Sequence, residues 1–236
     1  MPADVEGERF PGESAEYRRA REELLEAEVE LRRQGARVAQ QRQELPTGGE
    51  VPADYEFEEW DEEAGAPRRV RLSELFAQGM DTLFLYSFMI VEPEQELWFV
   101  GPCPSCTSII DAIDGEIPHI TQRVSFAVAA RGPIERFREH GRSRGWRHAR
   151  LLGTLDGDYS RAYGAADAEG NQWPIATVFT KRDGHMHHFW SSELFWAQRD
   201  PGQHPRHVDF MWPVWAVFDA TPGGRGDDWN PALEYR

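Results

Sequence analysis

Cysteine is nearly absent from this chain, and the two cysteines that it has lie together. Among 236 residues, only Cys103 and Cys106 carry a thiol. A framework of several structural disulfides is therefore excluded. In a reducing compartment, two cysteines separated by two residues are typical of dithiol chemistry or of metal binding rather than of a structural cross-link.

Positive charge and long apolar runs are also scarce. The chain has 26 Lys and Arg against 41 Asp and Glu, a formal net charge of −15. A nucleic-acid partner is not expected, because neutralising phosphates requires clustered cations. The longest apolar run, residues 83–91, is far shorter than the roughly 20 residues that cross a bilayer. The first ten residues do not resemble a secretory signal. We therefore expect a cytoplasmic protein with no membrane partner.

The sequence divides into a long helix and one larger domain. Residues 15–45 contain no proline and a single glycine, and Ser14 precedes them as a candidate N-cap, so a long helix is expected. Apolar residues recur in it at every seventh position, which favours either a stripe packed on the same chain or a homodimer contact. We predict an N-terminal helical arm over residues 1–46 and one domain over residues 47–236.

The apolar patterns of the larger domain alternate between strand and helix. Strands are predicted at residues 55–60, 70–72, 83–91, 124–130, 150–153, 174–181 and 185–190, and helical segments at 73–76, 103–114 and 134–140. A buried strand, a helix starting at the cysteine pair, a second buried strand, a helix and a β-hairpin follow the element order of a thioredoxin fold. We predict an α/β three-layer sandwich with a central mixed sheet, preceded by the long helix.

The spacing of the cysteines predicts different roles for them. At the start of a helix, free backbone N–H groups and the helix dipole stabilise a Cys103 thiolate. The three-residue offset places Cys106 on the same face of the helix, within reach of a disulfide. We expect Cys103 to be the exposed nucleophile that attacks a thiol or disulfide substrate, and Cys106 to be the resolving thiol.

Several stretches of the chain carry a family resemblance. In order, they are residues 24–46, 54–57 (DYEF), 70–76 (VRLSELF), 83–90 (LFLYSFMI), 101–106 (GPCPSC), 130–133 (ARGP), 145–146 (GW), 178–184 (VFTKRDG) and 218–226 (FDATPGGRG). In these stretches the chain resembles the bacterial thioredoxin-like family catalogued as domain of unknown function 899. The resemblance implies a thioredoxin-like oxidoreductase without an established substrate.

Four features depart from the family pattern. Pro102 stands between Gly101 and the first cysteine, and Ala130 replaces a frequent serine. The hairpin at residues 180–190 is rich in histidine, and residues 142–150 are unusually basic. These departures leave room for a member of the family with altered chemistry.

The histidine-rich hairpin raises the alternative of a metal site. Copper-binding relatives of thioredoxin use two nearby cysteines and one histidine from a late hairpin, and the resemblance places His188 at that position. Cys103, Cys106 and His188 would then bind copper or zinc. The competing interpretation is that His188 is hydrogen-bonded in the core. For dithiol–disulfide exchange itself, we expect no cofactor.

Other residues bear on the substrate. Trp98 and Phe99 precede the dithiol closely and are predicted to contact substrate. Pro174 is a candidate for the cis-proline that thioredoxin folds place opposite the dithiol, although a trans proline is commoner. Peroxide reduction is less favoured, because Val100 stands where a peroxiredoxin has threonine. The aromatic segment 190–218 either lines a pocket beside the dithiol for an apolar substrate or fills the core, and the core interpretation is favoured. His204 and His207 are interpreted as structural.

Three functions remain open at this point. The first is a dithiol–disulfide oxidoreductase that acts on a protein or a small molecule. The second is the copper or zinc protein, and the third is a non-catalytic, partner-binding member of the fold.

Overall fold

The computed structural model describes residues 9–93, 97–155, 157–199, 204–226 and 229–235. The chain forms two compact units, Met1–Pro46 and Thr47–Arg236. The first unit contains the helix α1 (Ala15–Gln43), and the Ser14 hydroxyl accepts a hydrogen bond from the Tyr17 N–H at 3.1 Å. The predicted helix and its cap are therefore confirmed. The apolar stripe of α1 includes exposed leucines such as Leu24 and Leu31, and its packing partner stays a prediction.

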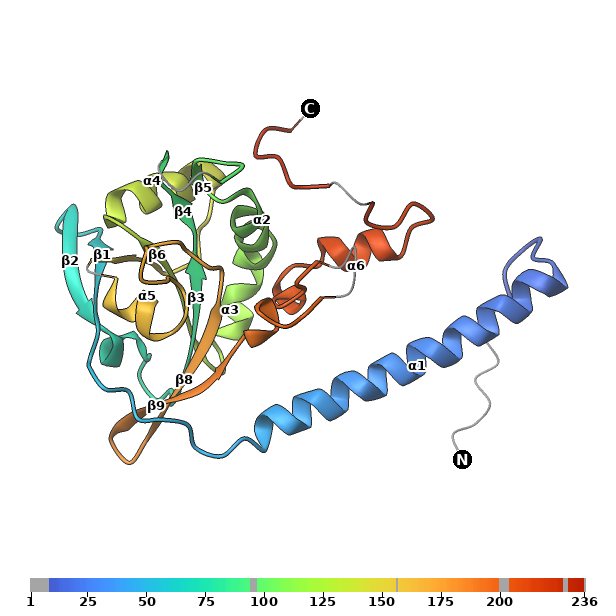
Figure 1. The fold of residues 1–236 in the computed structure, drawn as a ribbon, viewed down its shortest axis with the longest axis horizontal. Coiled ribbons are helices and arrows are strands. Elements are labelled where there is room, and N and C mark those ends of the chain that lie inside the picture. Colours follow the sequence, from blue (N-terminus) through green and yellow to red (C-terminus); the bar gives the residue numbers. More distant parts are fainter. Residues whose placement is uncertain (1–8, 94–96, 156, 200–203, 227–228, 236) are drawn as a thin grey trace. The chain divides into compact units, whose positions relative to one another are not determined.

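A seven-stranded mixed sheet forms the centre of the second unit (Figure 1). Its strands are β1 (Glu56–Asp61), β2 (Ala66–Arg71), β3 (Thr82–Phe88), β6 (Ser125–Arg131), β7 (Leu151–Thr154), β8 (Ala176–Arg182) and β9 (His185–Ser191), in the order β2-β1-β7-β6-β3-β8-β9. Strands β3, β6 and β7 are parallel, and all other neighbours pair antiparallel. The short strands β4 (Ile90–Val91) and β5 (Gly101–Pro102) form a separate pair.

Helical segments connect and cover the strands. The α-helices of this unit are α2 (Pro104–Ile113), α3 (Ile117–Ile120), α4 (Ile134–Arg144), α5 (Asp158–Ala162) and α6 (Val214–Asp219), and the 3₁₀ helices are Leu72–Leu75, Asp114–Glu116, Glu193–Phe195 and Asp209–Met211. In the described part of the chain, no helix has both the length and the apolar character that a membrane span requires.

The central strand is shorter than its apolar pattern predicts. β3 ends at Phe88, and Ile90–Val91 then pairs with Gly101–Pro102 instead of continuing in the sheet. The Cys103 N–H also donates to the Met89 carbonyl at 3.0 Å. Periodicity alone does not reveal this break, because both segments are equally apolar. The consequence is that the residue entering α2 is bonded to the end of β3.

The fourth helix is longer than the glycines in its sequence indicate. Gly141 lies inside α4, where a Cβ atom would come within 2.7 Å of the Leu151 side chain, so glycine allows a close approach to β7. The helix ends at Gly145, whose φ of 78° is the left-handed conformation typical of a helix C-terminus.

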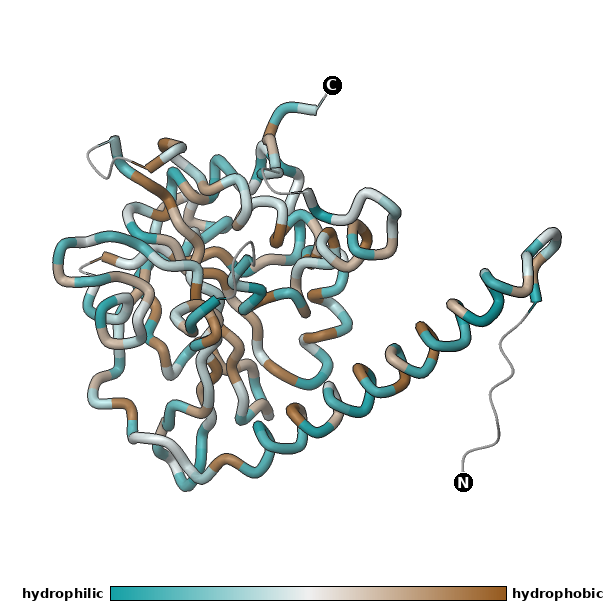
Figure 2. Tube along the Cα trace, turned by 45° about the vertical axis from the view of Figure 1, so that its right-hand side comes forward, coloured by the Kyte–Doolittle hydropathy of each residue, from teal (hydrophilic) through white to brown (hydrophobic). Residues whose placement is uncertain are grey.

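The sheet separates two apolar cores. Along β3, Leu83 and Leu85 face a core that includes α5, whereas Tyr86 and Phe88 face the core that includes α2. This alternation follows from the two-residue period of a strand. Apolar residues concentrate along these inner strands, while α1 is mostly hydrophilic with single apolar positions (Figure 2).

The topology of the central strands identifies the fold. The unit β3-α2-β6 is parallel, the hairpin β8-β9 follows, and the four strands lie in the order β6-β3-β8-β9 with β8 antiparallel to β3. This is the thioredoxin-like arrangement, so the predicted fold is confirmed.

Candidate active site

Cys103 is the N-cap of α2. Its backbone is extended, with φ −62° and ψ 125°, and its Sγ accepts a hydrogen bond from the Cys106 N–H at 3.4 Å. Pro104 occupies the first helical turn, where a backbone N–H has no intrahelical acceptor, so its absence in proline costs no hydrogen bond. The helix therefore starts at the position that the sequence predicted for a nucleophilic thiolate.

The surroundings of Cys103 favour its thiolate. The Cys106 thiol can donate to the Cys103 sulfur and is the largest influence that lowers the pKa of Cys103. The backbone N–H groups of Cys106 and Ser105 lower that pKa further, and burial only partly opposes them. The helix start thus supplies the donors that a thiolate needs.

Cys106 has the opposite character. Its burial raises its pKa well above the ordinary value, and the adjacent Cys103 adds to that increase. The Tyr86 hydroxyl is buried without a hydrogen-bond partner among the described residues, so it is available to donate to a Cys106 thiolate. This hydroxyl and the Met89 N–H both act against the effect of burial on the pKa of Cys106. The pKa of Tyr86 is itself raised well above its usual range, mainly by burial. At neutral pH this arrangement favours a proton on Cys106 rather than on Cys103.

Neither sulfur is freely exposed. Both cysteines are free thiols, and Cys103 is 5% exposed against 1% for Cys106. The expectation that Cys103 is exposed is therefore wrong, although Cys103 is the more exposed of the two cysteines. The physical reason is that residues distant in sequence form a pocket over the dithiol.

The pocket beside the dithiol is apolar and has a volume of about 230 Å³. It is lined by Tyr86, Met89, Leu97, Trp98, Phe99, Cys103, Ser105, Cys106, Ile109, Trp173, Pro174, Phe195, His204, Pro205, His207, Val208, Trp212 and Asn230. The predicted substrate residues Trp98, Phe99 and Pro174 are thus all brought to the cysteines. Trp98 is 61% exposed, and its ring stands edge-on to Phe99 at 4.8 Å.

The segment after the hairpin supplies part of this pocket, which was the less favoured of the two interpretations of its aromatic residues. Trp212 lines the pocket, and so do His204 and His207, for which the sequence predicts only a structural role. The Trp212 indole N–H donates to the Ser108 hydroxyl at 2.9 Å and so joins this segment to α2. The abundance of aromatic and histidine residues was the available signal, but only tertiary contacts show which of them reach the dithiol.

The two pocket histidines are neutral at physiological pH. Burial lowers the pKa of His204 to about 4, and the nearby His207 contributes to the same decrease. Burial also lowers the pKa of His207. The Nε2–H of His207 donates to the Pro174 carbonyl at 2.7 Å, which fixes the loop before β8 against the pocket. The described peptide bonds are all trans, so Pro174 is not the predicted cis-proline.

His188 lies away from the two sulfurs. Its ring stacks on Tyr163 at 5.8 Å on the α5 side of the sheet, whereas α2 covers the opposite side. His188 Nε2 is 2.9 Å from the Ser191 hydroxyl, and burial lowers the pKa of His188. Within the described residues, no three His, Cys, Asp or Glu side chains form a group that could hold a metal ion. The structure therefore does not assemble the predicted site of Cys103, Cys106 and His188.

Comparison with solved structures gives distant matches. A crystal structure of the hypothetical protein SMc02350 from Sinorhizobium meliloti is 16% identical, covers 78% of this chain and 90% of its own, and has a TM-score of 0.42. The mitochondrial 2-Cys peroxiredoxin from Plasmodium falciparum is 13% identical, and the match covers 76% of this chain and 98% of the peroxiredoxin, with a TM-score of 0.42. The exposed lipoprotein thioredoxin Etrx1 from Streptococcus pneumoniae is 13% identical, and the match covers 69% of this chain and 99% of Etrx1, with a TM-score of 0.39.

Comparison at the level of sequence families gives a match over almost the whole chain. No curated protein matches the chain significantly. The model of the family described as "Bacterial protein of unknown function (DUF899)" matches residues 8–236. The chain therefore belongs to this bacterial family, DUF899.

Proposed function

We propose that this protein is a dithiol–disulfide oxidoreductase in which Cys103 attacks and Cys106 resolves. The observation that carries the proposal is the opposite environment of the two thiols. Hydrogen-bond donors lower the pKa of Cys103 at the start of α2, while burial raises that of Cys106. A thiolate next to a protonated thiol, one helical turn apart, is the arrangement that sequential disulfide exchange requires.

The reaction proceeds in two successive thiol–disulfide exchanges. The Cys103 thiolate attacks one sulfur of a substrate disulfide, forms a mixed disulfide and releases the other sulfur as a thiolate. That thiolate takes up a proton, and Cys106 loses one. The Cys106 thiolate then attacks Cys103, releases the second substrate thiolate and closes the Cys103–Cys106 disulfide. Two electrons pass to the substrate, and an external thiol reductant returns the protein to its dithiol form.

Two groups assist the second exchange. The Met89 N–H and the Tyr86 hydroxyl both favour the Cys106 thiolate, which is otherwise costly because it forms in a buried place. These groups lie at the end of β3, so the strand that positions the helix also supports its resolving thiol.

The pocket supports a substrate whose disulfide is flanked by apolar or aromatic groups. Its walls include Trp98, Phe99 and Trp212, and its volume of about 230 Å³ admits a side chain or a small aromatic group. The exposed Trp98 and the half-buried Phe99 provide contact area for a substrate, which is either a protein or a small molecule. The exchange itself uses protein groups alone.

Trapping the mixed disulfide tests the proposal. Cys106→Ser retains the attacking thiol and removes the resolving one, so incubation with 5,5′-dithiobis(2-nitrobenzoate) should leave one stable adduct on Cys103, detected by mass spectrometry. Cys103→Ser is the matched control and should form adduct much more slowly, because Cys106 is buried and protonated. Preferential labelling of Cys106, or no adduct on Cys103, would contradict the assignment of roles.

A further inference from the structure

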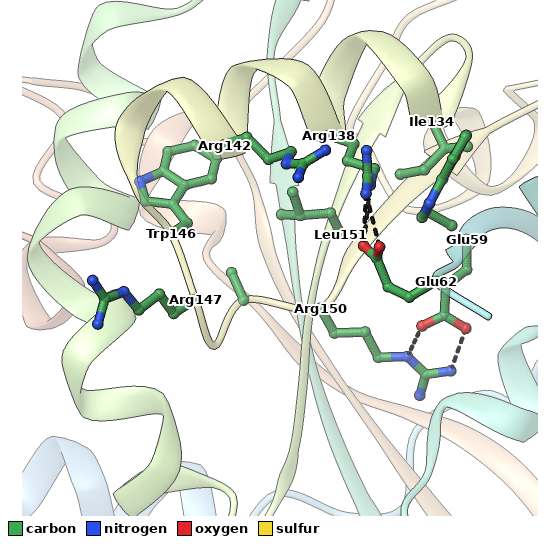
Figure 3. A pocket seen from close by; sticks show the side chains of 12 residues that line it. Glu59, Glu62, Ile134, Arg138, Arg142, Trp146, Arg147, Arg150 and Leu151 are labelled. Carbon is green, nitrogen blue, oxygen red and sulfur yellow. Dashed lines mark hydrogen bonds and ion pairs between the residues drawn. The ribbon is translucent and has the colours of Figure 1, made fainter. Parts of the chain in front are cut away.

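A second pocket lies between α4 and the strands β1 and β7 (Figure 3), and it shares no residue with the dithiol pocket. Its volume is about 250 Å³. It is lined by Glu59, Trp60, Glu62, Ile134, Arg138, Gly141, Arg142, Trp146, Arg147, Ala149, Arg150 and Leu151. These residues include much of the basic segment 142–150, which takes no part in the proposed dithiol chemistry. Four arginines in one pocket are notable because the whole chain has a formal charge of −15.

Two of the four arginines are neutralised by glutamates. Arg138 donates to both oxygens of Glu62 at 2.9 and 2.8 Å, and its guanidinium lies over the Trp60 ring at 4.4 Å. Arg150 donates to both oxygens of Glu59 at 2.7 and 3.1 Å. These bidentate pairs hold the walls of the pocket in place and add no net charge.

The other two arginines have no such partner. Across the residues that the structure describes, the guanidinium groups of Arg142 and Arg147 make no hydrogen bond or ion pair, and both residues are exposed. Figure 3 shows Arg142 reaching from α4 toward Arg138, while Arg147 stands on the other side of Trp146. The Arg147 N–H donates to Asp114 at 2.9 Å, which fixes the backbone that carries this side chain. The pocket therefore has a net charge of +2.

We propose that this pocket binds a phosphate group, either free or as a small monoester. A phosphate dianion balances the +2 charge of the pocket. The planar fork of Arg142, which reaches into the pocket beside Arg138, matches phosphate oxygens in a bidentate way, and Arg147 adds positive charge from the other side of Trp146. A single carboxylate would balance only half of that charge. Apolar walls formed by Ile134, Leu151 and the Trp146 ring limit solvent on one side, which strengthens the attraction relative to bulk water.

Titration calorimetry with inorganic phosphate tests the site. The full chain is titrated at pH 8, where phosphate is mainly a dianion, with ionic strength held constant by sodium chloride. We expect saturable binding of one phosphate, weakened at least about tenfold in the double variant Arg142→Gln, Arg147→Gln. The matched control is Arg32→Gln, Arg123→Gln, which removes two exposed arginines outside the pocket and should retain the affinity.

A second variant tests the pocket from the opposite direction. Glu62 has a side chain that is 77% exposed, so Glu62→Gln removes a competing negative charge beside Arg138, while the amide oxygen can still accept a hydrogen bond from Arg138. We expect this variant to bind phosphate several-fold more tightly. A titration without saturation, an equal loss in the control double variant, or weaker binding by Glu62→Gln would each overturn the proposal.

The source of the phosphate is distinguished by a parallel titration with phenyl phosphate. Tighter binding than that of inorganic phosphate assigns the site to a monoester whose organic part contacts Trp146. Equal binding of the two ligands, lost together in the pocket double variant, assigns it to the phosphate group alone.

Discussion

Two thiols separated by one helical turn occupy opposite electrostatic environments in this protein. Cys103 meets donors from the Cys106 thiol and from the first turn of α2, whereas Cys106 is enclosed in the core beside Tyr86. The free-energy difference between their thiolates therefore comes from position in the fold and not from the residue type. This difference sets the order in which the two sulfurs react.

The pH dependence of Cys103 alkylation should reflect this environment. Because the pKa of Cys103 is lowered, its thiolate should form at a lower pH than the thiolate of an ordinary cysteine peptide, whose pKa is about 8.5. Alkylation by iodoacetamide in Cys106→Ser, where the hydroxyl still donates, should therefore have a midpoint below that of a model peptide. In Cys106→Ala, which lacks the donor, the midpoint should move upward. Identical profiles for the two variants would show that the Cys106 side chain does not stabilise the Cys103 thiolate.

The Tyr86 hydroxyl should accelerate resolution. Tyr86→Phe removes a donor to the buried Cys106 thiolate, and hydrogen bonds to charged groups contribute about 1.5–3 kcal/mol. We expect the mixed disulfide to persist roughly tenfold longer, measured by acid quenching and mass spectrometry, with little change in the first exchange. Tyr159→Phe, a buried tyrosine in the other core, is the control and should resolve at the wild-type rate.

At the scale of the elements, α2 is held by side chains from distant segments. Trp212 donates to Ser108, and Arg144 and the Trp146 indole both bond to Asp111. The local pattern predicted where α2 starts, because proline and the cysteine spacing mark that position. The sequence could not show that residues 204–212 cover the dithiol, since contacts across about a hundred residues leave no periodic signal.

Two tryptophans of the same pocket should behave differently on truncation. Trp212 is 2% exposed, so Trp212→Ala should reduce the free energy of unfolding by about 3–5 kcal/mol. Trp98 is 61% exposed, and Trp98→Ala should change it by less than about 0.5 kcal/mol while raising the KM for an aromatic disulfide. Urea unfolding and steady-state kinetics measure the two effects. A large loss of stability in Trp98→Ala would mean that this residue belongs to the core rather than to a substrate surface.

At the scale of the whole molecule, the side of the sheet on which a residue lies decides which residues it can contact. The lack of polar alternation along β3 correctly indicated a strand with two buried faces, and the element order indicated the fold. The pattern does not say which face receives α2, so the metal alternative placed His188 beside the dithiol. The competing interpretation, in which His188 is hydrogen-bonded within the domain, agrees with the structure. Its actual partners are Tyr163 and Ser191, on the side opposite the dithiol.

Separation by the sheet predicts that His188 is independent of the dithiol. His188→Ala should leave the reduction potential of the cysteine pair unchanged and should not alter the metal content of purified protein. Elemental analysis and redox titration of this variant beside the wild type measure both quantities. Stoichiometric copper or zinc that is lost in His188→Ala and also in Cys103→Ser would refute this separation.

The most direct test of the central claim is a redox titration of the cysteine pair. The full chain is equilibrated in buffers of reduced and oxidised dithiothreitol or glutathione, quenched with a thiol-alkylating reagent and resolved by mass. We predict a single two-electron transition between a dithiol and a Cys103–Cys106 disulfide, absent in both Cys103→Ser and Cys106→Ser. A pair that stays reduced at every accessible potential, or that oxidises only between molecules, would contradict the account.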